Sequence, residues 1–242
     1  MQRLRFSKSV MFVLVLFLVC GSVRADRRGY VWTYEYMTMA KGASELEYYM
    51  TSKIADMHKF DEKSTWEHQI ELEYGLTDRW DIAIYEKYKQ TYDTSGEKGE
   101  YGGHKLRTRY RFGEKGEHPL DTLVYLEYIK ADNSTSPEIL EGKLILAKNF
   151  GDFNFAYNQI LKVGINGRGG NENEYAMGLN YESNRQWKFG IESTGNYTED
   201  KYYIGPTISW GGEKFWMGLG GLRGLNDRSD DIRVRFIIGF PF

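Results

Sequence analysis

The stretch HQIELEYGLTDRWDIAIYEKYK, residues 68 to 89, decides the fold, because it contains two runs that alternate in polarity around a tight polar turn. In the first run Ile70 and Leu72 fall on one side of the chain, and Glu71 and Glu73 fall on the other. Side chains of a β-strand alternate with a period of two residues, so the stretch predicts a β-hairpin. Its apolar face either lines the core of a soluble barrel or points outward into lipid.

The same alternation continues along the rest of the chain, and none of the runs has the period of an amphipathic helix. The sequence therefore predicts an all-β protein, an antiparallel barrel of about twelve strands. We expect the strands at residues 43–54, 65–76, 80–90, 103–113, 120–130, 138–149, 153–164, 173–183, 186–197, 201–211, 214–223 and 231–242.

The connections between these runs alternate in length. The short set lies at residues 76–80, 149–153, 183–187 and 211–214, with a slightly longer member at 113–120. The longer and more polar set lies at residues 55–65, 91–102, 131–137, 165–174, 197–200 and 224–230. Short turns at one rim and long loops at the other are typical of bacterial outer-membrane barrels, in which the short turns are periplasmic.

The first residues have the pattern of a secretory signal peptide. Arg3, Arg5 and Lys8 precede an apolar run that is too short to span a bilayer as a helix, and small residues follow it. We expect cleavage after Ala25. The only cysteine, Cys20, lies inside this segment, so the mature chain has no disulfide and no thiolate metal site.

The expected cleavage divides the chain into a signal peptide (1–25), an N-terminal extension (26–42) and an outer-membrane barrel (43–242). The extension also alternates in polarity, but a thirteenth strand would place the short turns on the outside, so we expect a periplasmic extension packed at the mouth of the barrel. Segment 1–25 holds four of the 32 basic residues and no acidic one, which leaves 28 basic against 34 acidic residues. A net charge near −6 argues against a nucleic-acid partner.

The faces that oppose the apolar residues carry too much charge for the core of a soluble barrel. A cation that faced lipid near the midplane would cost roughly 2 to 4 kcal/mol, whereas charged residues in a wet lumen pair with one another. The sequence therefore predicts that the apolar faces contact lipid and the charged faces line the lumen. These lumen residues are Glu45, Glu47, Lys53, Glu67, Glu71, Glu73, Lys87, Lys105, Arg107, Arg109, Arg111, Glu127, Glu141, Lys143, Glu174, Glu192, Arg233 and Arg235.

The final run, DIRVRFIIGFPF, has alternating apolar residues and ends on an aromatic residue. Phe236, Ile238, Phe240 and Phe242 share its apolar face, which resembles the signal that outer-membrane proteins present to the barrel-assembly machinery. We therefore expect this machinery, outer-membrane lipids and lipopolysaccharide to be partners of the chain, and the outer membrane of a Gram-negative bacterium to be its location.

A functional hypothesis comes from two groups of lumen charges. The basic group is Lys105, Arg107, Arg109 and Arg111, with Arg233 and Arg235 from the last strand. The acidic group is Glu45, Glu47, Glu67, Glu71 and Glu73. A transverse field between them would orient small polar or anionic solutes in a diffusion channel. In the alternative, the two groups neutralise each other and close the lumen, which gives a non-conducting structural or adhesion barrel.

An enzyme is the third alternative, a lipid-modifying hydrolase built around His68 and the nearby Ser64. No third group orients this pair, so an interfacial histidine is the favoured interpretation. Loops 171–174 and 226–231 offer carboxylates, but neither matches a calcium-binding pattern. We expect no enzymatic activity, no metal and no cofactor.

The segments KGASELEYY, from Lys41, and YGLTDRW, from Tyr74 to Trp80, carry a family resemblance. They are similar to segments of uncharacterised Gram-negative outer-membrane barrels, including meta-pathway phenol-degradation-type proteins. The resemblance covers the whole barrel in its rhythm but only the first hairpins in residues. It implies an outer-membrane barrel and supplies no catalytic motif.

Overall fold

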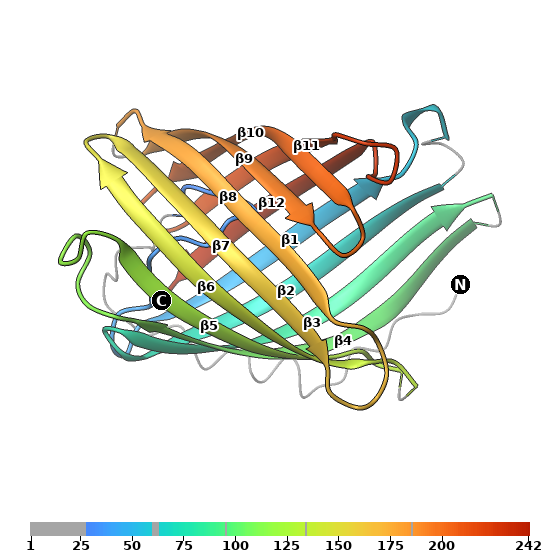
Figure 1. The fold of residues 1–242 in the computed structure, drawn as a ribbon, viewed down its shortest axis with the longest axis horizontal. Helices are drawn as coiled ribbons and strands as arrows, with labels where there is room; N and C mark the ends of the chain where they lie inside the picture. Colours follow the sequence, from blue (N-terminus) through green and yellow to red (C-terminus); the bar gives the residue numbers. More distant parts are fainter. Residues whose placement is uncertain (1–27, 60–62, 95, 134, 185) are drawn as a thin grey trace.

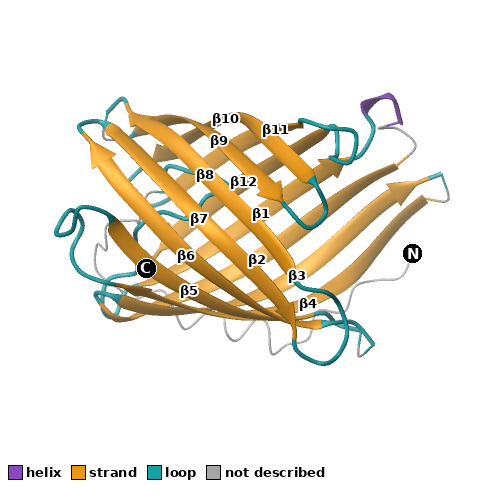
Figure 2. Ribbon diagram, in the orientation of Figure 1, coloured by secondary structure: helices purple, strands orange, loops and turns teal. Residues whose placement is uncertain are grey.

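The computed structural model describes residues 28–59, 63–94, 96–133, 135–184 and 186–242. These residues form one closed antiparallel barrel in which each strand pairs with its neighbours in the sequence, and the last strand pairs with the first. Figures 1 and 2 show the tilted strands of this barrel. The strands are β1 (Ser44–Ile54), β2 (Lys63–Thr77), β3 (Trp80–Asp93), β4 (Gly96–Arg111), β5 (Asp121–Lys130), β6 (Glu138–Phe150), β7 (Phe153–Gly164), β8 (Glu172–Glu182), β9 (Trp187–Asn196), β10 (Lys201–Gly211), β11 (Trp216–Gly224) and β12 (Ile232–Pro241).

One short 3-10 helix, η1 (Met57–Lys59), follows β1. Among the described residues, no helix is both long and apolar enough to cross a membrane.

The predicted twelve-strand barrel is confirmed, and one predicted loop is wrong. Residues 91–102 continue β3 and β4 almost to their tips, so that the two strands are joined at residues 94–95. Cross-strand contacts hold this extension together, since the rings of Tyr88 and Tyr101 lie 5.5 Å apart and Gln90 hydrogen-bonds Glu97. The length and polarity of this segment suggested a loop, but these pairs keep it in the ladder.

We call the two ends of the barrel the turn rim and the loop rim. The turn rim holds the connections 78–79, 112–120, 151–152, 183–186 and 212–215, and the loop rim holds the others. The barrel closes at the turn rim through Ser44 and Phe242, whose backbone groups exchange hydrogen bonds of 2.9 and 3.3 Å.

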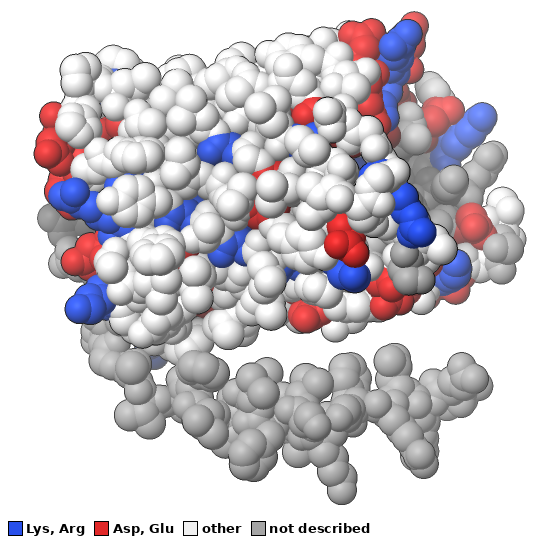
Figure 3. All heavy atoms as spheres, turned by 60° about the horizontal axis from the view of Figure 1, so that its bottom comes forward, with Lys and Arg blue, Asp and Glu red and all other residues white. Residues whose placement is uncertain are grey.

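The opening hairpin has its charged face inward and its apolar face outward. Glu71 is fully buried and Glu73 is 2% exposed, whereas Ile82 and Ile84 are 41% and 45% exposed. Figure 3 shows the same distribution on one face of the molecule, where mostly uncharged side chains cover the middle and charged ones gather toward the ends. The predicted orientation of this hairpin, with the isoleucines outward and the glutamates inward, therefore agrees with the structure.

The N-terminal extension enters the barrel. We call residues 28–41 the plug and residues 30–34 the plug tip; no residue of the plug belongs to a strand. Tyr30 and Val31 are each 1% exposed, and the blue trace of this segment is visible between the strands in Figure 1. The sequence predicted that the whole extension packs at the mouth of the barrel. This prediction is wrong for the plug tip, which lies inside the lumen because side chains far along the chain bind it there.

The foot of the plug reaches the turn rim. Met39 N–H donates to Asp81 at 3.0 Å and Lys41 N–H donates to Asp78 at 3.0 Å. Gly75 is required here, since a Cβ atom at this position would lie 2.0 Å from the carbonyl oxygen of Ala40. The glycine in the YGLTDRW segment therefore lets the chain pass from the lumen into β1.

Candidate functional site

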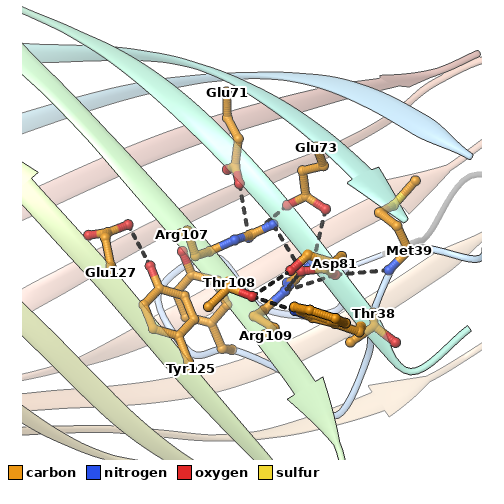
Figure 4. Close-up of polar contacts among 12 residues, drawn as sticks. Thr38, Met39, Glu71, Glu73, Asp81, Arg107, Thr108, Arg109, Tyr125 and Glu127 are labelled. Carbon is orange, nitrogen blue, oxygen red and sulfur yellow. Dashed lines mark hydrogen bonds and ion pairs between the residues drawn. The ribbon is translucent and has the colours of Figure 1, made fainter. Parts of the chain in front are cut away.

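The lumen is the candidate site, and an ion-paired network covers one of its walls. Arg107 on β4 contacts Glu71 at 2.9 Å and Glu73 at 2.8 Å, both on β2. Arg109, the next inward residue on β4, contacts Glu73 at 2.9 Å and Asp81 of β3 at 2.7 Å. Figure 4 shows how these side chains point toward one another from three neighbouring strands. We call this region, β2 to β4, the ion-paired wall.

Burial makes this network sensitive to the loss of any member. The side chains of Arg107, Glu71 and Asp81 are fully buried. Charges removed from water keep their stability only when they are paired, because the desolvation penalty is several kcal/mol per ion. The arginines and glutamates are therefore neutralised within one wall and do not face each other across the lumen, which weakens the predicted transverse field.

The other predicted basic residues have separate partners. Lys105 pairs with Glu127 on β5 at 3.1 Å, and Arg111 reaches Glu114 at the turn rim at 3.5 Å. On β12, Arg233 pairs with Asp230 at 2.7 Å. Arg235 has no carboxylate within ion-pair distance among the described residues; its Nε donates to Thr51 Oγ1 at 2.9 Å, and its guanidinium lies 4.0 Å from the ring centre of Trp32 in the plug.

The remaining predicted acidic residues, all on β1 and β2, also have partners. Glu45 accepts a hydrogen bond from Trp216 Nε1 at 2.9 Å. Glu47 pairs with Arg28 of the plug at 3.2 Å, and Glu67 pairs with Lys53 at 2.8 Å.

Three carboxylates, those of Glu47, Glu71 and Glu73, place oxygens within 4.8 Å of one another. Their surroundings are already cationic, because Arg28 contacts Glu47 and Arg107 contacts the other two. The hydroxyl of Tyr49 also lies within hydrogen-bond distance of Glu47 and of Glu71 and can donate to either. These arginines therefore balance the negative charge that a bound metal ion would otherwise balance.

The wall formed by β7 to β11 differs, because its residues hold the plug tip. Glu192 on β9 accepts three successive backbone hydrogen bonds, from the N–H groups of Val31, Trp32 and Thr33, at 2.6 to 2.8 Å. We call this region the docking wall. One carboxylate thus satisfies three donors that would otherwise be buried without partners.

Asn158 on β7 extends this attachment to Tyr34. Its Oδ1 accepts from Tyr34 N–H at 2.6 Å, and its Nδ2 donates to Tyr34 O at 2.9 Å. The side-chain amide thus exchanges the same two hydrogen bonds with Tyr34 that the backbone of a neighbouring strand would make. The hydroxyl of Tyr30 lies within hydrogen-bond distance of two acceptors, the carbonyl oxygens of Asn154 at 2.6 Å and Gly178 at 3.0 Å.

Glycines on the docking wall make room for the plug tip. A Cβ atom at Gly178 would lie 2.5 Å from the Tyr30 ring, and one at Gly220 would lie 3.2 Å from Cβ of Val31. The wall is therefore shaped around this segment. Sequence reasoning placed Glu192 in the lumen but missed its role and did not single out Asn158; inward-facing glycines were the signal for a close approach of backbone.

Above the plug tip, a cavity of about 360 Å³ lies in the loop-rim half of the lumen, with Trp32 and Tyr34 among its lining residues. We call it the vestibule. Its charged lining contains Lys53, Lys105, Lys143, Lys162, Lys201, Arg233, Arg235, Glu141, Glu172, Glu174 and Glu199. In the described part of the chain, all of these cations except Arg235 have a carboxylate within ion-pair distance. At the loop rim, the hydrogen bond from Lys201 holds the pKa of the Glu199 carboxyl below its usual value, so this carboxylate is charged at neutral pH.

Several vestibule cations lie against aromatic rings. Lys143 Nζ lies 4.3 Å from the ring centre of Tyr34 and 4.0 Å from that of Tyr125. The guanidinium of Arg233 lies 3.8 Å from the ring centre of Tyr203. Both cations also have carboxylate partners, since Lys143 pairs with Glu141 at 2.7 Å and Arg233 with Asp230 at 2.7 Å, so the rings add to ion pairs that are already formed.

A second cavity, of about 280 Å³, opens in the turn-rim half and includes Glu35 of the plug and Asn180 of β8 in its lining. The plug tip therefore lies between two cavities of the same lumen.

His68, the residue considered for a hydrolase, lies outside the lumen on β2. Its Nδ1 is 2.7 Å from the hydroxyl of Tyr48, and the two rings stack with their centres 6.0 Å apart. Ser64 takes no part in this contact, so the structure brings together a Tyr–His pair and not a Ser–His pair.

Known proteins with the same architecture share almost no sequence with this chain. No family model and no curated protein matches it. An outer-membrane channel of Pseudomonas putida F1 is similar over 86% of this chain and 98% of its own, with a TM-score of 0.63 and 10% identity. The fold is that of an outer-membrane barrel. The KdgM porin is similar over 82% of this chain and 99% of its own, with a TM-score of 0.59 and 10% identity. A second structure of that porin, in complex with disordered oligogalacturonate, gives a TM-score of 0.53 at 10% identity.

Proposed function

We propose that the protein is an outer-membrane channel for the uptake of small polar or anionic solutes, with the plug closing its lumen at rest. The observation that carries the proposal is the vestibule, a cavity in the loop-rim half of the lumen whose lining includes Arg235, a guanidinium with no carboxylate partner among the described residues. Fixed positive charge in a low-dielectric cavity raises the local concentration of anions. The similar structures are a channel and a porin, which supports a transport role and no enzymatic one.

A non-conducting structural barrel is the second candidate, because two observations favour it. The ion-paired wall neutralises its own charges, and the plug tip occupies the middle of the lumen. The candidates differ in one respect: in a channel the plug is removable, whereas in a structural barrel it is a permanent part of the core.

Planar-bilayer conductance of purified protein tests the proposal. We expect low conductance for the full-length mature chain and steady, anion-preferring conductance for a variant that lacks residues 28–36. A double variant of the intact chain, Glu192→Gln with Asn158→Ala, removes the main attachments of the plug tip and should conduct in the same way if the deletion variant fails to fold.

Heat-modifiable migration in gels is the control for folding, since a closed barrel resists detergent before boiling. If both variants are folded and inserted but remain silent in the bilayer, the structural barrel replaces the channel.

We also propose that β12 carries the assembly signal, through Phe236, Ile238, Phe240 and Phe242, and that the chain contacts outer-membrane lipid and lipopolysaccharide. Phe242 has two roles that can be separated, because its backbone also closes the barrel with Ser44. Deletion of Phe242 removes both roles, whereas Phe242→Ala keeps the backbone bonds and removes the aromatic ring. Reduced recovery of the alanine variant in the outer-membrane fraction supports the signal; normal recovery contradicts it.

The likeness of the first hairpins to meta-pathway phenol-degradation-type proteins remains part of this proposal. Its support is the pair of segments from Lys41 and from Tyr74 to Trp80, and it names no solute. In an outer-membrane barrel the turn rim is periplasmic, so solutes would enter through the vestibule.

A further inference from the structure

The cations of the vestibule also hold the plug, and this double role points to a mechanism. Arg235 lies over the ring of Trp32 at 4.0 Å, and its Nη1 donates to the carbonyl oxygen of Val31 at 3.4 Å. Lys143 lies over the ring of Tyr34 at 4.3 Å. Lys143 pairs with Glu141 at 2.7 Å, whereas Arg235 has no carboxylate partner among the described residues, so an anion in the cavity and the plug below compete for the guanidinium of Arg235.

Arg235 is the centre of this arrangement. Its guanidinium has neutral partners only among the described residues: a threonine hydroxyl, a backbone carbonyl and an indole ring. An arginine that lines a cavity and has no carboxylate partner can bind the carboxylate or phosphate group of a solute, because its planar fork matches these groups.

The plug tip is less completely satisfied than its foot. Trp32 Nε1 is buried without a hydrogen-bond partner in the described part of the chain, and so are Asn180 Nδ2 and Thr207 Oγ1 of the docking wall. Each such group costs about 1 to 3 kcal/mol relative to its state in water. Withdrawal of the tip would return these groups to water, which offsets part of the loss of its bonds to Glu192.

We propose that the vestibule binds a small carboxylate or phosphorylated solute at Arg235, and that this binding releases the plug tip from the lumen. This inference rests on the proposed channel function. Binding that removes the contacts of Arg235 with the tip favours its withdrawal, and by linkage a withdrawn tip leaves Arg235 free for tighter anion binding.

The test uses citrate as the probe and a cysteine as the reporter. The mature chain has no cysteine after the expected cleavage, so Val31→Cys introduces a single reactive group at a site that is 1% exposed. We expect citrate to raise the rate of its reaction with a water-soluble maleimide about tenfold. Sodium chloride at equal ionic strength should have little effect.

Two matched controls define the site. Met39→Cys lies in the same segment, is equally buried and is held at the turn rim by Asp81, so its reaction should not respond to citrate. Arg233→Gln removes a vestibule cation that contacts Asp230 and Tyr203, not the plug, and should keep the citrate response of Val31→Cys. Arg235→Gln should give fast labelling that no longer depends on citrate.

Unchanged labelling of Val31→Cys in citrate overturns the inference, and so does an equal loss of response in the Arg233 and Arg235 variants. Conductance of the variant that lacks residues 28–36 separates the two proposals. A conducting deletion variant with no citrate response leaves the channel intact and removes the solute-released plug. A silent, folded deletion variant removes the channel itself.

Discussion

The ion-paired wall and the docking wall enclose the same lumen but fill it by different means. On β2 to β4, long charged side chains meet one another, as in the contacts of Arg107 with Glu71 and Glu73. On β7 to β11, small residues and single polar side chains leave space that a second segment of backbone occupies, as at Gly178 and Glu192.

The difference shows that closure of a wide barrel has two physical routes. Charged side chains close the space permanently, because separating them would leave buried charges without partners. A docked backbone closes it reversibly, because most of its attachments are hydrogen bonds that water can replace at a small net cost. The predictions below compare the two walls, in order of decreasing effect.

Loss of a charge from the ion-paired wall should have the largest effect. Arg107→Gln would leave Glu71, Glu73 and Asp81 with one arginine in place of two, and we expect a loss of about 3 to 5 kcal/mol in the free energy of unfolding. The midpoint of heat-modifiable migration in gels measures it. An unchanged midpoint would show that the glutamates become protonated and so compensate for the lost arginine.

Loss of charge on the docking wall should loosen the plug without unfolding the barrel. Glu192→Gln weakens three hydrogen bonds to the plug tip, and we expect the tip to lose on the order of 1.5 to 3 kcal/mol of attachment. Maleimide labelling of Val31→Cys in this background checks it. Glu127→Gln, whose partners are Lys105 and Tyr125, is the matched control and should leave the labelling rate unchanged. A slow rate in the Glu192 variant would contradict the assigned role.

A larger side chain on the docking wall should also loosen the plug tip. Gly178→Ala places a methyl group 2.5 Å from the Tyr30 ring, and crowding of this kind costs about 1 to 3 kcal/mol. We expect faster labelling of Val31→Cys. Gly142→Ala, where nothing lies within 4 Å of the new atom, should have no effect. Equal rates in the two variants would mean that the plug tip adjusts to the methyl group.

A charge at the turn rim should matter least. Arg111 belongs to the same basic ladder as Arg107, but its carboxylate partner Glu114 is 60% exposed. Arg111→Gln should cost about 0.5 to 1 kcal/mol, because an ion pair with an exposed carboxylate contributes little. The same gel assay compares it with the Arg107 variant, and similar losses would contradict the distinction between arginines with buried and with exposed carboxylate partners.

The sequence by itself determined the number of strands, their positions and the face that each presents to lipid. Alternation with period two is a local property, so Ile82 and Glu73 could be assigned to opposite faces without knowledge of any partner. The local pattern gave a wrong prediction at residues 91–102, whose polarity suggested a loop. Cross-strand pairs such as Tyr88 with Tyr101 hold this segment in β3 and β4.

Only the tertiary structure decided what fills the lumen. Val31 and Glu192 lie 161 residues apart in the chain, and no periodicity relates them. The sequence also offered the arginines of β4 and the glutamates of β2 as a field across a channel or as mutual partners. In the barrel these residues are mutual partners. Only β3 lies between β2 and β4, so Arg107 comes within 3 Å of Glu71 and Glu73. Strand alternation fixes which way a side chain points, but closure of the barrel fixes what it meets there.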